Sequence, residues 1–156
     1  QPYMQEPGLV ELNDGRLMGF CRTNGGSQYV AYSQDGGKTF STLKPSNIIS
    51  PVSPASIERI PASGDLLLVW NNHRDITPEL RGKRTPLTIA VSKDEGKTWQ
   101  QIQNLEVNPN GWYCYTAIEF TKDGVLLGHC AGDRSKNNGL AESQITFIPL
   151  SVIYEQ

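Results

Sequence analysis

The sequence has few cysteines, no excess of charge of either sign and no long apolar run. Its three cysteines (Cys21, Cys114 and Cys130) cannot all pair with one another, so they indicate free, buried thiols rather than a disulfide framework. Fourteen basic and sixteen acidic residues give a net charge of −2, which provides no basic footprint for nucleic acid and no polybasic membrane patch. The longest apolar runs, such as 66–70, span only about five residues, too few for a membrane span.

Helical periodicity is also almost absent. Instead, runs of about four to eight residues alternate or are wholly apolar, and turn residues bound them, which is typical of β-strands. Asp-Gly or Gly-Asp pairs stand between several of these runs and favour tight hairpins. The sequence therefore predicts an all-β fold with strands at 8–12, 16–22, 28–33, from Phe40 onward, 55–60, 66–71, 87–92, 99–105, 115–121, 125–130 and 143–150.

Two similar octets indicate a structural repeat. SQDGGKTF occupies 33–40 and SKDEGKTW occupies 92–99, so they begin 59 residues apart. With the expected strands, they divide the chain into cycles of about 50 to 60 residues, a period typical of four-stranded propeller blades. A single propeller segment with blades near 1–45, 46–106 and 107–156 is the preferred interpretation; a sandwich and a β-solenoid are the alternatives.

The octets themselves are predicted to be structural. Their Ser, Asp and Thr side chains are suited to binding nearby backbone amides and fixing a turn, and the glycine at the fifth position permits a positive φ. Asp35 and Asp94 resemble calcium ligands at first sight, but the octets lack the run of alternating oxygen ligands that a calcium loop needs. We expect no metal and no cofactor.

The octets resemble the Asp-boxes, or BNR repeats, of the sialidase (neuraminidase) superfamily, and the resemblance runs along nearly the whole chain. Glu6, followed by VELNDGRL at 10–17 and then by Arg22, resembles a sialidase segment. In that segment a glutamate precedes one strand and a functional arginine ends the next.

Two further positions match the family through their spacing. Arg84 lies eight residues before the second octet, where sialidases place another substrate-binding arginine. Tyr115 lies eight residues before the Asp123-Gly124 turn, at the offset of the catalytic tyrosine. The resemblance implies the C-terminal half of a six-bladed propeller, here about three blades.

The resemblance also implies a function, that of a retaining exo-glycoside hydrolase of the exo-α-sialidase type. Tyr115 would be the nucleophile, Glu6 would assist it, and Arg22 and Arg84 would bind a substrate carboxylate. A guanidinium is a planar, always charged fork for a carboxylate. A neutral tyrosine is not repelled by that carboxylate, and sialidases depart from the two-carboxylate scheme in this way.

Each assignment has a simpler alternative. Glu6 is also consistent with a solvated loop acid, and Arg22 with a partner for a surface acid. Arg84 has basic neighbours at 81 and 83, which makes its register less secure, and Tyr115 is also consistent with an ordinary strand aromatic. The alternative function is a non-catalytic Asp-box propeller segment that binds glycans or proteins, or a blade array that serves assembly only.

The chain also departs from the family. Sialidases are more than twice as long, and their third arginine and acid/base aspartate lie in earlier blades that have no counterpart here. The missing half is expected in the same protein, in another chain or in a second copy, and the isolated chain is expected to be catalytically incomplete. The glycan substrate is a sialoside or another acidic or neutral glycoside. By resemblance alone, secretion or a periplasmic location is consistent with the family.

Overall fold

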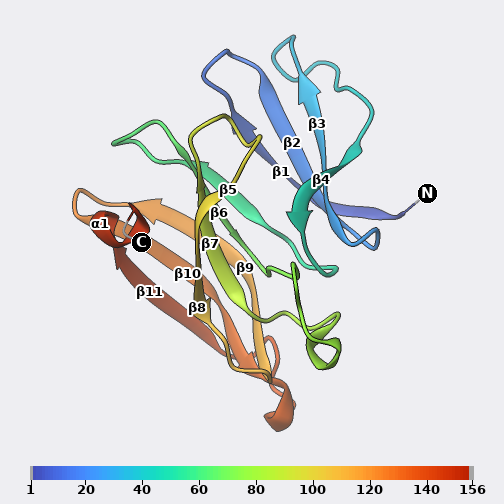
Figure 1. Cartoon of the computed structure of the whole chain (residues 1–156), viewed down its shortest axis with the longest axis vertical. Coiled ribbons are helices and arrows are strands. Elements are labelled where there is room, and N and C mark those ends of the chain that lie inside the picture. Colours follow the sequence, from blue (N-terminus) through green and yellow to red (C-terminus); the bar gives the residue numbers. More distant parts are fainter. Residues whose placement is uncertain (1, 155–156) are drawn as a thin grey trace.

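The computed structural model describes residues 2–154, which form three antiparallel sheets (Figure 1). The first sheet has the order β1 (Met4–Glu11), β2 (Leu17–Thr23), β3 (Ser27–Ser33) and β4 (Lys44–Ile49). The second has the order β5 (Ser56–Arg59), β6 (Leu66–Trp70), β7 (Leu87–Ser92) and β8 (Gln100–Glu106). The third has the order β11 (Ser143–Pro149), β10 (Gly124–Asp133) and β9 (Gly111–Phe120).

These sheets confirm the predicted all-β fold of antiparallel propeller blades. Two sheets have the expected four strands, and the third has three within residues 2–154. In Figure 1 the sheets follow one another in chain order, from blue through green to red. The first strand of each sheet lies next to its counterpart, because β1 contacts β5 and β5 contacts β9. This places β1, β5 and β9 where the innermost strands of a propeller lie.

The core lies between the sheets. Strand β6 is buried on both faces, and successive side chains of a strand point to opposite faces. Leu66, Leu68 and Trp70 therefore pack toward the first sheet, whereas Leu67 and Val69 pack toward the third. An uninterrupted apolar run is what a strand covered on both sides requires.

Both octets form turns that satisfy their own polar groups. In the first, Asp35 accepts hydrogen bonds from the Thr39 amide (2.9 Å) and hydroxyl (2.7 Å). The Ser33 hydroxyl donates to Asp35 (2.8 Å) and accepts from the Gly37 amide (2.9 Å). The second octet repeats this pattern around Asp94. Each turn thus joins the third and fourth strands of its sheet.

Replacing Asp35 by asparagine is expected to destabilise the chain in a pH-dependent way. Hydrogen bonds from the Thr39 hydroxyl, the Thr39 amide and Ser33 lower the pKa of Asp35 to about 2. Because this pKa is depressed on folding, the stabilisation is complete above the unfolded value of about 4 and is lost as the pH falls toward 2. Thermal melts should show a lower Tm for D35N at pH 7 and a difference that shrinks steadily as the pH falls toward 2. A constant difference across this range would contradict the assignment.

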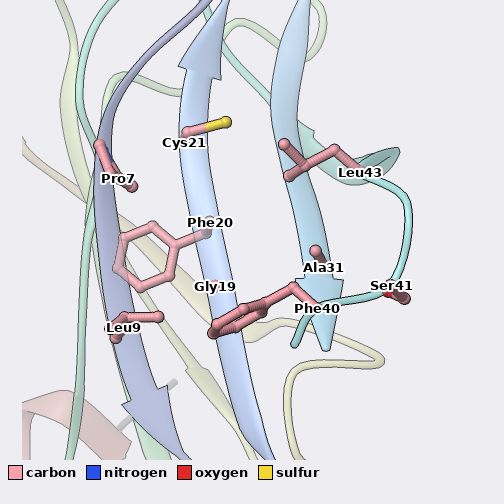
Figure 2. Close-up of a pocket in the computed structure, with 9 residues that line it drawn as sticks. All are labelled: Pro7, Leu9, Gly19, Phe20, Cys21, Ala31, Phe40, Ser41 and Leu43. Atoms are coloured by element: carbon pink, nitrogen blue, oxygen red, sulfur yellow. The ribbon is translucent and has the colours of Figure 1, made fainter. Parts of the chain in front are cut away.

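The outer faces of the first and third sheets are apolar, and no other sheet of residues 2–154 packs on them. On the first sheet, Leu9, Gly19 and Ala31 are register partners on the face that points away from the second sheet. With Phe40 they line an open groove of about 380 Å³ (Figure 2). On the third sheet, Ile145 is 75% exposed and Phe147 is 50% exposed. Each end of the stack therefore presents apolar surface.

The remaining elements are short. They are the 3₁₀ turns η1 (Pro78–Leu80) and η2 (Arg134–Lys136) and the helix α1 (Leu150–Tyr154), whose Ile153 is buried in the core beside the third sheet. Within residues 2–154, no helix has the length and apolar character needed to cross a membrane.

Candidate active site

Glu6 and Tyr115 occupy equivalent, strained positions on two inner strands. Their φ angles are 54° and 55°, in the left-handed region that non-glycine residues rarely adopt. The register of β1 against β2 shifts between Gln5 and Gly8, and that of β9 against β10 shifts between Cys130 and Gly128. Each residue thus lies in a β-bulge, a feature that re-aims a side chain and is frequent beside active sites.

The bulges bring Tyr115, Glu6 and Arg22 together. The Tyr115 hydroxyl donates a hydrogen bond to Glu6 Oε1 at 3.2 Å. Arg22 Nη2 lies 2.9 Å from the same oxygen and 2.8 Å from Gln5 Oε1. The Arg22 side chain is only 12% exposed, whereas Glu6 keeps 38% of its side chain exposed. One carboxylate oxygen therefore joins a phenol to a largely buried guanidinium.

Arg84 lies on the other side of Tyr115. Its guanidinium carbon is 5.3 Å from the centroids of both the Tyr115 and the Trp112 rings, which is within cation–π range. Its Nη1 atom donates to Cys114 Sγ at 2.8 Å. Burial disfavours the charged form, but the interactions with Cys114 and Tyr115 outweigh this and raise the pKa of Arg84. Arg84 therefore carries its charge throughout the physiological pH range.

Hydrogen bonds to backbone carbonyls join the second and third sheets and fix this arrangement. The Tyr113 amide donates to the Arg84 carbonyl at 2.9 Å, and the Ser56 hydroxyl of β5 donates to the Thr116 carbonyl at 2.5 Å. These bonds lie on either side of Tyr115 and lock β9 against the second sheet. The first sheet supplies Glu6 and Arg22, the segment before β7 supplies Arg84, and β9 supplies Tyr115.

The structure therefore places the four residues selected from the sequence in one cluster. It also adds neighbours that the sequence analysis missed, namely Gln5, Trp112, Cys114 and Arg134. Arg134 directly follows β10, and near the end of that strand Gly132 is the register partner of Trp112. The guanidinium carbon of Arg134 lies 4.0 Å from the Trp112 ring centroid. The pairing of β9 with β10 is what brings Trp112 near Arg134. The sequence does not reveal this pairing, because the bulge beside Tyr115 shifts the register of the two strands.

Cys114 is expected to resist alkylation in the folded chain. Burial raises the pKa of its thiol to about 11, although the Arg84 hydrogen bond opposes this shift. About one thiol in a thousand would then be ionised at pH 8, and the thiolate is the reactive form. Iodoacetamide followed by peptide mass spectrometry should find Cys114 unmodified in buffer and modified in urea. Rapid modification in buffer, at the rate seen in urea, would contradict this.

Comparisons with known proteins show a family match and a shared propeller fold. Residues 4–127 match the model of the BNR repeat-like domain. The structure is similar to the leech intramolecular trans-sialidase, with a TM-score of 0.72 and 18% identity over 95% of this chain and 24% of that one. It is also similar to the NanB sialidase of Streptococcus pneumoniae, with a TM-score of 0.73 and 22% identity over 94% and 23%.

An α-L-arabinofuranosidase of Fusarium graminearum is a further structural neighbour, with a TM-score of 0.61 and 18% identity over 92% of this chain and 44% of that one. None of the curated proteins matches the chain significantly in sequence. The chain thus spans about a quarter of the two sialidases and less than half of the arabinofuranosidase. At these identities the similarity establishes a fold shared with glycoside hydrolases.

Proposed function

Because this chain belongs to the BNR repeat-like domain family of sialidase-superfamily propellers, we propose that it carries the nucleophile side of a sialidase-like, retaining exo-glycoside hydrolase site. The observation that supports this most is the 3.2 Å hydrogen bond from the Tyr115 hydroxyl to Glu6. A free phenol has a pKa of about 10 and is a weak nucleophile at neutral pH. A carboxylate in contact with it supplies the base that such a nucleophile needs.

In the proposed reaction, Tyr115 Oη attacks the anomeric carbon and its proton passes to Glu6. The bond from that carbon to the leaving oxygen breaks, which leaves the sugar covalently attached to the tyrosine. Water then displaces the phenolate, which recovers its proton from Glu6, so that two inversions retain the configuration. The proton for the leaving group comes from an acid outside this chain, and the attacking water returns a proton to that acid in the second step.

The arginines fit the substrate side of the proposal. A substrate carboxylate beside the anomeric carbon would repel a carboxylate nucleophile but not a neutral tyrosine. Arg84 contacts the Tyr115 ring and has no carboxylate within 4 Å among the described residues. Arg22 already contacts Glu6. We therefore assign carboxylate binding to both, with Arg22 also holding Glu6 toward Tyr115.

The remaining blades of the propeller are proposed to cover the apolar outer faces. Leu9 is 57% exposed on the first sheet and Ile145 is 75% exposed on the third. The internal interfaces of this chain join sheet faces of the same kind, with apolar side chains between them. Such faces are therefore suited to further blades, supplied by the same protein, by another chain or by a second copy.

The test is the release of 4-methylumbelliferone from its N-acetylneuraminic acid glycoside. The assay compares the 156-residue chain with a complete propeller that contains it, and includes the corresponding arabinofuranoside because of the arabinofuranosidase neighbour. Turnover of the sialoside by the complete propeller is expected. If neither glycoside is cleaved while glycans still bind, the enzymatic proposal is wrong and the binding alternative replaces it.

A further inference from the structure

Two half-buried arginines beside the candidate site have no acidic partner among residues 2–154. Arg16, Arg22 and Arg59 each lie within 4 Å of a carboxylate. Arg84 and Arg134 are partly buried and lie in none of the ion pairs formed within residues 2–154. An exposed arginine needs no partner because water solvates it, whereas a half-buried guanidinium has lost part of that solvation.

These two arginines form one positive cluster around Trp112. The guanidinium carbon of Arg134 is 4.0 Å from the Trp112 ring centroid and that of Arg84 is 5.3 Å from it. Burial, and secondarily the charge of Arg84, lower the pKa of Arg134. Two guanidinium groups thus contact the same ring, and their like charges interact in a partly desolvated place, an arrangement that an anion would stabilise.

The surrounding chain holds the cluster in place. The Arg134 amide donates to the Asn110 carbonyl at 2.8 Å, which ties the end of β10 to the start of β9. The nearest acid in sequence, Asp133, instead accepts hydrogen bonds from the Ser135 amide (2.8 Å) and hydroxyl (2.6 Å). Arg134 Nε and Trp112 Nε1 are buried donors with no acceptor among the described residues. The cluster therefore has positive charge and unpaired buried donors, with no anion among the described residues to balance them.

We propose that Arg134 acts with Arg84 to bind an anionic substituent of the glycan, a carboxylate or a sulfate, and is a specificity-determining residue. This inference rests on the proposed function, and it assigns the main anion contact to the Trp112 side of Tyr115. On the other side, Glu6 already neutralises Arg22 at 2.9 Å. The free charge of the site thus comes from Arg84 and Arg134, and a guanidinium pair is well suited to a planar or tetrahedral oxyanion.

The experiment measures anion binding by the 156-residue chain. Sodium sulfate and free N-acetylneuraminic acid are titrated separately while the Trp112 indole N–H signal is followed by NMR, with chloride held constant because salt screens such contacts. Removing one of two charged donors should raise the Kd of both probes about tenfold or more in R134Q. R134K should bind at an intermediate level, since it keeps the charge but loses the fork.

The matched control is R74Q. Arg74 is exposed, and within residues 2–154 its Nη2 atom donates to the Asn47 carbonyl, away from the cluster. The Kd of R74Q for each probe should therefore stay within about twofold of that of the original chain. Thermal melts establish that each variant folds. An unchanged Kd in folded R134Q, or an equal loss in R74Q, would overturn the inference.

A second comparison separates this inference from the proposed function. Arg134-dependent anion binding without any hydrolysis by the complete propeller would reject the hydrolase and keep the anion site. Sialoside hydrolysis with anion binding that does not depend on Arg134 would reject the anion site and keep the hydrolase.

Discussion

Replacing Tyr115 by phenylalanine is expected to lower kcat for sialoside hydrolysis by about a thousandfold or more in the complete propeller. The substitution removes only the hydroxyl, whose hydrogen bond goes to Glu6 at 3.2 Å. The ring that supports Arg84 at 5.3 Å remains, so substrate binding and KM should change little. The measurement is the steady-state release of 4-methylumbelliferone from the sialoside.

Tyr32→Phe is the matched control. Tyr32 is a half-buried tyrosine of β3 that contacts Arg16 through its ring, and it takes no part in the cluster around Tyr115. Its kcat should equal that of the original protein. The Tm of Y115F should also stay unchanged, since Tyr115 is 45% exposed. If Y115F retains turnover at the level of the control, Tyr115 is not the nucleophile.

Replacing Leu68 by alanine is expected to lower the free energy of unfolding by about 2–5 kcal/mol. Leu68 is completely buried in the core between the first and second sheets. The smaller side chain loses its burial energy and leaves a cavity, because sheets packed on both sides cannot collapse to fill it. Urea unfolding followed by far-UV circular dichroism measures the change.

Ile145→Ala provides the comparison for this effect. Ile145 is also a branched aliphatic strand residue, but 75% of it is exposed. Its replacement should change the free energy of unfolding by no more than about 0.5 kcal/mol. Equal losses at the two positions would mean that the core between the first and second sheets is not what stabilises the chain. The structure instead predicts a clear difference between a covered and an uncovered sheet face.

The strand pattern is largely a local property, and the sequence predicted it well. Alternating and apolar runs predicted all eleven observed strands to within a few residues at most ends. The largest differences are informative. Strand β1 begins at Met4 rather than at residue 8, and β9 begins at Gly111 rather than at Tyr115. In both strands a bulge interrupts the alternation, and the predicted strand began only at or after it.

The prediction of β4 differed for another reason. The sequence placed its start at Phe40, but the octet turn continues into an irregular segment and β4 begins at Lys44. Phe40 instead lies in the groove on the outer face of the first sheet (Figure 2). Aromatic character alone does not distinguish a strand residue from a side chain that covers a sheet.

The candidate residues could be selected from the sequence because family spacing marks Glu6, Arg22, Arg84 and Tyr115. Their catalytic and binding roles remain predictions. No family spacing marks Trp112 or Arg134 in the sequence. Their contact depends on the register of the β9–β10 hairpin. A one-residue shift in register reverses which face a side chain occupies, so this cluster is visible only in the folded chain.

The sequence by itself determined the all-β repeat and its octet turns, because alternation and short-range hydrogen bonds operate over a few residues. Only the tertiary structure decided that Tyr115 reaches Glu6 across 109 positions of the chain. That contact requires the inner strands of three sheets to pack side by side, and two bulges to turn the side chains toward each other. Of the three arginines around Tyr115 and Trp112, it also decided that Arg22 is paired with a carboxylate and that Arg84 and Arg134 are not, because charge pairing depends on distances between separate sheets.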